Sequence, residues 1–198
     1  MLTLCIDTSN SYLTCALIVD DEIISNIFVP CFKRQSEELF PVLKEVFDKV
    51  KINPATIDSI CVSVGPGSYT GTRIAMTLAK TIGEMLPCDV YTISSLRLYA
   101  GGNPNTMVIM NARANRAYVG VYDNNEIIVD DHIEMLDEID PKDYNIVGDG
   151  LLIDKMDNYP DIPLAFLKTK PVWKKEEDIA YLVPMYLKES ESYYRWLS

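Results

Sequence analysis

Apolar and polar residues alternate with two different periods along this chain, first a strand-like period and then a helix-like one. Three short, β-branched apolar runs come first, separated by turn-forming polar residues, and they predict an antiparallel meander. Helical and strand-like patterns then alternate, which is the order that builds a sheet covered by helices. The predicted strands of this half are 1–6, 11–19, 22–29, 57–64 and 89–93, and the predicted helices are 35–51 and 68–86.

The second half of the chain has a weaker pattern. Four residues that break regular structure, Gly101-Gly102-Asn103-Pro104, predict a lobe boundary, with a first domain over 1–102 and a smaller one over 103–198. The second domain is expected to have strands at 106–110 and 117–122, a weak signal over 137–163 with a turn at 148–150, and partly helical character at 176–187 until Pro184.

The order of the elements predicts the fold class. The series β-β-β-α-β-α-β in the first domain is that of one lobe of an actin-like ATPase, a ribonuclease H-like fold. We therefore expect an α/β protein with two lobes of mixed sheet flanked by helices, the second lobe reduced.

The two predicted helices differ in the faces that they can bury. The first helix repeats large apolar residues at three- and four-residue intervals, including Leu39 and Leu43, and should pack on the sheet. The second helix carries a small residue every four positions, and larger apolar residues lie beside that strip. Another backbone can come close to such a strip, either this chain's own first helix or the helices of a second subunit. The small residues are Gly71, Ala75, Ala79 and Gly83, and the larger ones are Ile74, Leu78, Ile82 and Met85.

A glycine-rich corner, 64–74 (VGPGSYTGTRI), joins a predicted buried strand to the second helix. Its glycines permit backbone angles closed to other residues, and free N–H groups at a helix start suit a phosphate or a carboxylate. The spacing fits neither the Walker loop nor the dinucleotide fingerprint. A tight turn and an anion-binding loop therefore both remain open from the pattern alone.

Four segments carry a family resemblance: LCIDTS at 4–9, SEELFP at 36–41, GPGSYTGTRI at 65–74 and NARANRAY at 111–118. They resemble, in order, the I-D-T-S turn, the H-S-E-x-L-x-P helix start, the G-P-G-S-F/Y-T-G-x-R-I signature and the D-A-R-R-x-E-V-Y stretch of the bacterial TsaB (YeaZ) proteins. Gln35 and Asn111 stand where that family usually has His and Asp. The signature loop consists of Gly65, Pro66, Gly67, Ser68, Tyr69, Thr70, Gly71 and Arg73.

The resemblance implies an accessory subunit that is not an enzyme on its own. Such a subunit dimerises with a TsaD-type transferase and is required for threonylcarbamoyl transfer to N6 of adenosine 37 in tRNAs reading ANN codons. A TsaE-type ATPase joins the pair, and the wider complex uses ATP and Mg²⁺, while this chain is expected to bind no cofactor alone. The two helices are implied as the partner contact, with Leu39, Leu43, Gly71, Ala75, Leu78, Ala79, Ile82 and Gly83 as its residues. The sequence leaves open whether the isolated chain forms a homodimer.

Two enzymatic alternatives stay open. In an actin-like fold the first hairpin turn binds phosphate, so Asp7, Thr8, Ser9 and Ser11 are candidates for such a site, either vestigial or working in an ATPase or sugar-kinase-type phosphotransferase. The second phosphate hairpin of such an enzyme has no counterpart after residue 101. A degenerate M22-like peptidase would need a metal-binding pair of histidines, and His132 is the only histidine in the chain.

Charge and cysteine content limit the partners and the compartment. A net charge of −11 repels a polyanion, so tRNA contact is expected to be indirect, through another subunit. The five cysteines lack C-x-x-C pairing and are mostly in apolar runs, which is typical of reduced core thiols rather than a disulfide frame or a metal site. No apolar run approaches the ~18 residues of a membrane span, and we expect a cytoplasmic protein without a membrane partner.

Overall fold

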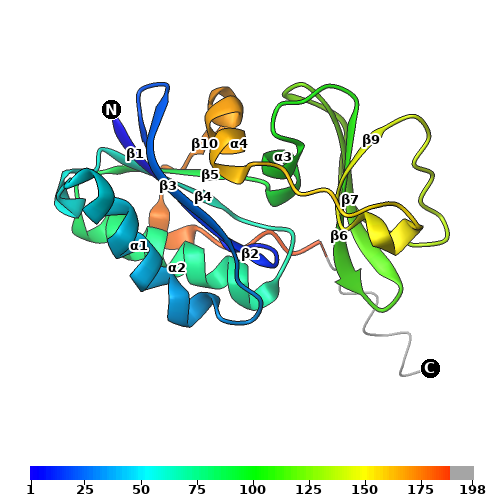
Figure 1. Ribbon diagram of the computed structural model, residues 1–198, viewed down its shortest axis with the longest axis horizontal. Coiled ribbons are helices and arrows are strands. Elements are labelled where there is room, and N and C mark those ends of the chain that lie inside the picture. The colour runs from blue at the N-terminus through cyan, green and yellow to red at the C-terminus, as the bar shows by residue number, and fades with distance from the viewer. Residues whose placement is uncertain (188–198) are drawn as a thin grey trace.

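The computed structural model describes residues 1–187, which form two sheets with helices packed on and between them (Figure 1). The elements in chain order, with η for a short 3₁₀ helix, are β1 (Leu2–Asp7), β2 (Tyr12–Val19), β3 (Glu22–Pro30), α1 (Gln35–Val50), η1 (Pro54–Thr56), β4 (Ser59–Ser63), α2 (Tyr69–Met85), β5 (Asp89–Ile93), α3 (Ser95–Ala100), β6 (Thr106–Arg113), β7 (Arg116–Asp123), β8 (Glu126–Met135), β9 (Asn145–Gly148), η2 (Gly150–Ile153), α4 (Ile162–Thr169), η3 (Lys170–Val172), β10 (Lys174–Lys175) and η4 (Ile179–Tyr181).

The first sheet has six strands in the order β10-β5-β4-β1-β2-β3. Strands β1, β2 and β3 form the antiparallel meander that the sequence predicts. Strands β4 and β5 add to β1 in parallel, each reached through a helix that returns across the same face. This order is that of a ribonuclease H-like, actin-like lobe, so the predicted fold class is confirmed for the first lobe.

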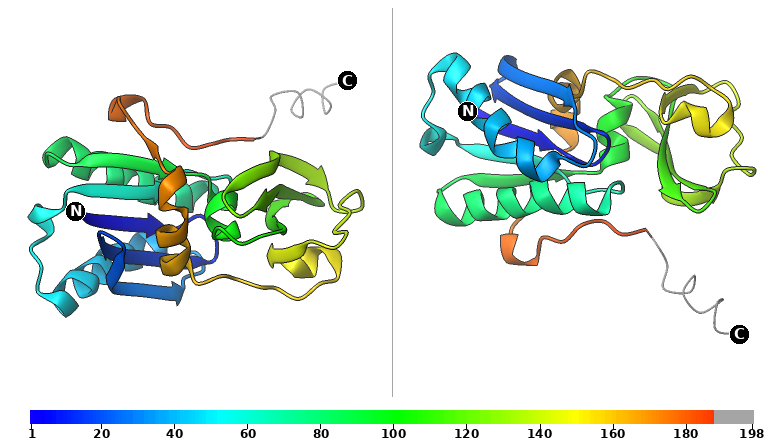
Figure 2. Two further views of the ribbon diagram at one scale, coloured as in Figure 1. Left: turned by 90° about the horizontal axis from the view of Figure 1, so that it is seen from above. Right: turned by 60° about the horizontal axis from the view of Figure 1, so that its bottom comes forward.

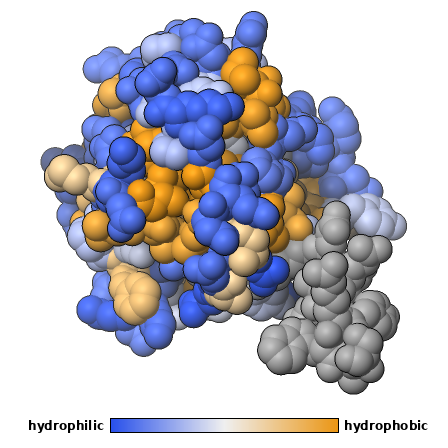
Figure 3. All heavy atoms as spheres, turned by 90° about the vertical axis from the view of Figure 1, so that its right-hand side faces the viewer, coloured by the Kyte–Doolittle hydropathy of each residue, from blue (hydrophilic) through white to orange (hydrophobic). Residues whose placement is uncertain are grey.

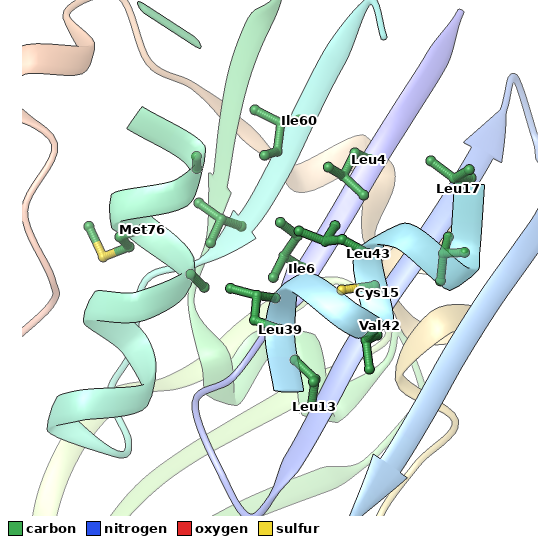
Figure 4. Packing of buried hydrophobic residues seen from close by; sticks show 14 of the residues in the cluster. Leu4, Ile6, Leu13, Cys15, Leu17, Leu39, Val42, Leu43, Ile60 and Met76 are labelled. Atoms are coloured by element: carbon green, nitrogen blue, oxygen red, sulfur yellow. The ribbon is translucent and has the colours of Figure 1, made fainter. Parts of the chain in front are cut away.

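Helices α1 and α2 cover one face of the first sheet (Figure 1). Leu39 and Leu43 of α1 point at Ile6 of the central strand, and Met76 lies on the neighbouring helix α2 (Figure 4). The four-residue apolar repeat of α1 therefore packs on the sheet as predicted, and it builds the larger part of one core with strands β1, β2 and β4.

A second core fills the space between the two sheets. Helices α3 and α4 lie there, on the face of the first sheet opposite α1 and α2 (Figures 1 and 2). Cys5 and Cys61 of the first sheet share this core with Met110 and Tyr122 of the second sheet, and Tyr99 of α3 is fully buried between them. Shared burial of this kind couples the two lobes, since neither sheet covers this apolar face alone.

The second sheet has four strands in the order β8-β7-β6-β9, with only the β6–β9 pair parallel. Its outer face carries a smaller core that includes Met107, Ile109 and Val119. Apolar side chains gather at the centre of this side of the molecule, between hydrophilic ones (Figure 3). The expectation of a second, reduced lobe of mixed sheet is confirmed.

The segment after α4 returns to the first lobe. Strand β10 pairs with β5, and η4 runs beside α2, where Lys80 Nζ donates to the carbonyls of Ala180 at 2.8 Å and Leu182 at 3.3 Å (Figure 2). The Leu182 side chain is buried in the first core. The division of the chain at residue 102 stays a prediction, and part of its second domain, 188–198, lies outside the described residues.

Four of the five cysteines are buried, and all five are free thiols, as the sequence predicts. Burial raises the pKa of the Cys5 and Cys61 thiols well above the usual value. These residues therefore serve as small apolar side chains in the core. No helix among the described residues combines the length and the apolar character that crossing a membrane requires.

Candidate functional site

The β1–β2 turn and the signature loop are bound to each other. Strand β1 ends at Asp7, and the loop that follows β4 leads into α2, whose N-cap is Ser68. The Ser68 Oγ accepts from the Gly71 N–H at 3.2 Å, and the Ser68 N–H donates to the Ser9 carbonyl at 2.7 Å. The Thr8 hydroxyl donates to the Gly71 carbonyl at 2.6 Å. The loop therefore caps the helix and fastens it to the first turn of the fold.

Two glycines of the loop make this close approach possible. A Cβ on Gly67 would collide with the Ser9 carbonyl, and one on Gly71 would collide with the Thr8 carbonyl. Any side chain at either position would force the two backbones apart. The glycine spacing that the sequence shows is thus explained by a contact between backbones.

The Asp7 carboxylate is fully buried beneath this contact. Its Oδ1 accepts from the Ser9 N–H at 3.1 Å and from the Ser63 hydroxyl, and its Oδ2 accepts from the Tyr99 hydroxyl at 3.3 Å. Burial raises the pKa of Asp7, although these three donors favour the ionised form and oppose the shift. The acceptor atoms of Asp7 are occupied by the chain's own donors.

The turn residues that were predicted to bind phosphate differ in their exposure to solvent. Thr8 and Ser9 are buried, whereas Ser11 is partly exposed. Within the signature loop Gly65 and Pro66 are buried, and Ser68, Tyr69 and Thr70 are exposed. The Arg73 guanidinium lies over the Tyr69 ring at 5.0 Å and donates to its hydroxyl. Phosphate binding at this turn stays a prediction.

The small strip of α2 faces this chain's own sheet. Ala75 and Ala79 are fully buried in the first core, Gly71 meets Thr8, and a Cβ on Gly83 would lie 2.6 Å from Val90 and 2.8 Å from Ile179. Leu39 of α1 is equally buried. Gly71, Ala75, Ala79 and Leu39 are thus covered by their own chain and Gly83 is half-buried, so a partner contact at these five residues stays a prediction.

The other three predicted contact residues line a groove between α1 and α2. This groove holds about 480 Å³, and Leu43, Leu78 and Ile82 form part of its floor. Its most exposed large apolar residues are Phe40 and Met85, at 66% and 76%; Met85 was expected to lie beside the small strip, but neither residue was predicted as a partner contact. Both lie three positions from a predicted residue, so the helical period was the signal that could have found them. We call this groove, with these five residues, the α1–α2 groove.

His132 lies on the edge strand β8, with its side chain partly exposed. Its Nδ1 is 2.8 Å from the Asp130 carbonyl, and its Nε2 is 3.3 Å from a Glu134 carboxylate oxygen. The described residues bring no group of three or more His, Cys, Asp or Glu side chains together in a way that could hold a metal ion.

A family model described as TsaD: tRNA N6-adenosine threonylcarbamoyltransferase matches residues 22–184. The chain belongs to this family. Among its relatives is the tRNA threonylcarbamoyladenosine biosynthesis protein TsaB of Bacillus subtilis, which is 29% identical over all of this chain and 98% of that protein. TsaB of Buchnera aphidicola subsp. Schizaphis graminum is 26% identical over 90% of both chains. The predicted membership of the TsaB (YeaZ) group is confirmed.

A solved structure of YeaZ from Pseudomonas aeruginosa has the same fold. It superposes with a TM-score of 0.77 at 19% identity, over 94% of this chain and 99% of that one. The shared fold therefore extends over nearly the whole of both molecules.

Proposed function

We propose that this chain is a non-catalytic subunit required for threonylcarbamoyl transfer to N6 of adenosine 37 in tRNAs that read ANN codons. The names of its TsaB relatives support the pathway. The burial of Asp7, whose oxygens accept from Ser9, Ser63 and Tyr99, supports a role without phosphate chemistry at the first turn. The transferase reaction then belongs to a TsaD-type partner.

The α1–α2 groove carries the proposal for how the subunit acts. Large apolar side chains such as Phe40 and Met85 rarely stay exposed beside an apolar groove unless another protein covers them. A TsaD-type subunit that places an apolar side chain between the two helices would bury both residues, and aromatic anchors of this kind dominate binding energy. In the isolated chain the same groove is open to a second copy, which would give a homodimer that competes with the partner.

The proposal also assigns the other components of the reaction, and the net charge bears on one of them, the tRNA. The net charge of −11 opposes direct binding of tRNA, so the partner subunit holds the nucleic acid. A TsaE-type ATPase joins the pair, and ATP and Mg²⁺ act in that wider complex. The reaction takes place in the cytoplasm, where tRNA is modified.

Mass spectrometry of nucleosides from bulk tRNA tests the proposal. Cells depleted of this chain should lose threonylcarbamoyladenosine, and re-expression of the chain should restore it. An unrelated modified nucleoside from the same digest serves as the internal control. Unchanged threonylcarbamoyladenosine after depletion would exclude a role in this pathway.

A further inference from the structure

Strand β3 forms one edge of the first sheet in the part of the chain that the structure describes. The Cys31 N–H donates to the Ser11 carbonyl at 2.7 Å, and the same register pairs Val29 with Leu13. Because antiparallel pairs alternate between bonded and non-bonded positions, the N–H and C=O groups of Asn26 and Phe28 point away from β2. An open row of backbone donors and acceptors therefore lies along β3.

This row ends at Pro30. Pro30 is the next residue after Phe28 whose backbone points away from β2. Proline has no N–H, and at this position the ladder with β2 needs none. The open row is thus limited to a short stretch of β3, enough for a few residues of an added strand.

The open edge is the floor of a groove of about 540 Å³. Glu38, Val42 and Glu45 of α1 form one wall, and Asp161 at the start of α4 stands on the other side. Figure 1 shows β3 between these two helices. A free strand edge beside a helix is the arrangement in which an extended peptide adds to a sheet.

This groove is separate from the α1–α2 groove. The residues of α1 that line it differ from Phe40 and Leu43, which face α2. The two surfaces therefore occupy different sides of the same helix, and one can be changed without the other.

The walls of the β3 groove carry more negative than positive charge. Three carboxylates line it, those of Glu38, Glu45 and Asp161, against one ammonium, that of Lys49. Lys49 pairs with Glu45 at 3.0 Å, and Arg34 pairs with Glu38 in the same way. Both are surface ion pairs, and such pairs rearrange at little cost. Since the whole chain carries −11, a second copy would bring like charge to this groove. A segment rich in Lys or Arg complements it.

We propose that the β3 groove binds an extended, basic segment of a partner protein, which adds as a further strand on β3. The backbone of Asn26 and Phe28 bonds that segment. Every second side chain of the segment faces α1, where Val42 offers an apolar contact and Glu38 and Glu45 meet Lys or Arg.

Two synthetic peptides probe this surface: one alternates valine with lysine, and the other alternates valine with glutamate. Both are titrated into the ¹⁵N-labelled full chain, followed by NMR. The lysine peptide should shift the amides of Asn26 and Phe28 and slow their hydrogen exchange, and the glutamate peptide should bind at least about tenfold more weakly. Equal binding of both peptides, or shifts that avoid β3, would overturn the proposal.

Matched variants identify the binding mode. Asn26→Pro removes an N–H that makes no bond to β2 and should weaken binding of the lysine peptide by about tenfold or more, whereas Asn26→Ala keeps that N–H and should bind the peptide normally. The pair Glu38→Lys with Glu45→Lys reverses two surface charges of α1 and removes their ion pairs with Arg34 and Lys49, which contribute little to stability. It should weaken binding as strongly, which keeps the test valid where proline harms the fold. Normal binding by this pair, or self-association of the wild type that Asn26→Pro removes, would contradict a basic partner segment.

Discussion

The Thr8 hydroxyl donates to the carbonyl of Gly71 at 2.6 Å, and the Thr8 carbonyl fills the space that a side chain on Gly71 would need. One residue belongs to the first turn of the chain and the other to the first turn of α2. This double contact fixes the rotation of α2 about its axis, so the small strip that begins at Gly71 faces the sheet.

Gly71→Ala should therefore destabilise the fold. The added methyl group has no room beside the Thr8 carbonyl, and overpacking of this kind lowers the free energy of unfolding by about 3 kcal/mol. Urea denaturation measures the loss. Thr77→Ala, at an exposed position of the same helix, is the control and should change stability by about 0.5 kcal/mol at most. Equal stability of both variants would mean that the turn and the helix separate easily.

Thr8→Val and Thr14→Val should differ although they make the same chemical change. Thr8→Val removes a buried hydrogen bond and leaves the Gly71 carbonyl without its donor, at a cost of about 1–3 kcal/mol. The Thr14 hydroxyl is buried without a hydrogen-bond partner, so its loss should be neutral or stabilising. Thermal unfolding of the two variants measures the difference. A larger loss for Thr14→Val would contradict the hydrogen-bond assignment.

Asp7 should give stability a pH dependence of defined sign. Burial raises its folded pKa, so the folded state binds the Asp7 proton more tightly than the unfolded state. The contribution of Asp7 is then fully present below the unfolded pKa of about 3.9 and is lost as pH rises through the folded pKa. Asp7→Asn cannot titrate, so its stability relative to wild type should rise with pH above about 4.

Urea denaturation of both proteins at several pH values tests this sign. A relative stability that is constant, or that falls as pH rises, would mean that the hydrogen bonds from Ser63, Ser9 and Tyr99 outweigh the cost of burial.

Leu182→Ala should destabilise the first lobe, although Leu182 lies far along the chain from the other buried residues of that core. The Leu182 side chain is buried in the core beneath α2, and truncating such a residue costs about 2–5 kcal/mol. Val183→Ala, at a neighbouring residue that is 69% exposed, should have little effect. Hydrogen exchange of the α2 amides, together with denaturant unfolding, measures both variants. Similar results for the two would show that the segment after α4 contributes nothing to the first core.

Local pattern was sufficient to predict strands β1 to β5 and helices α1 and α2 of the first lobe. The predicted helix at 68–86 is α2, Tyr69–Met85, and the predicted strand at 89–93 is β5. By contrast, no prediction was made for α3, β8, β9 or α4. Strand β8 has five exposed residues in a row followed by four that are partly buried, so it lacks the alternation that reveals a half-buried strand. The partly helical character expected at 176–187, up to Pro184, is present as the short helix η4, and the segment is held by contacts with α2 that are distant in sequence.

The orientation of α2 could not be predicted from the sequence. A strip of glycine and alanine fits a close approach to a partner as well as to the chain's own sheet, and only the contact between Gly71 and Thr8 distinguishes them. A charge at Ala79 would therefore disrupt the core instead of testing a partner contact. The burial of Asp7 could not be predicted either, since Ser63 and Tyr99, whose hydroxyls donate to it, are far from it in sequence.

Phe40→Glu and Met85→Glu, made together, should abolish binding of the TsaD-type partner. Both side chains are mostly exposed in the isolated chain, so it should stay folded, but the new carboxylates would be buried unpaired in the contact. The cost of about 3 kcal/mol or more corresponds to binding weaker by about a hundredfold. Phe32→Glu, at an equally exposed aromatic residue outside the groove, is the control. Titration calorimetry measures all three proteins.

Reconstituted transfer is the most direct test that this subunit acts through the α1–α2 groove. A TsaD-type transferase, a TsaE-type ATPase, ATP, Mg²⁺, threonylcarbamoyl-AMP and unmodified tRNA are combined with the wild-type chain or the Phe40→Glu, Met85→Glu variant. Threonylcarbamoyladenosine is then measured by mass spectrometry. We predict product with the wild type and with Phe32→Glu, and none above background with the groove variant. Equal product with the groove variant, or product in the absence of the chain, would contradict the account.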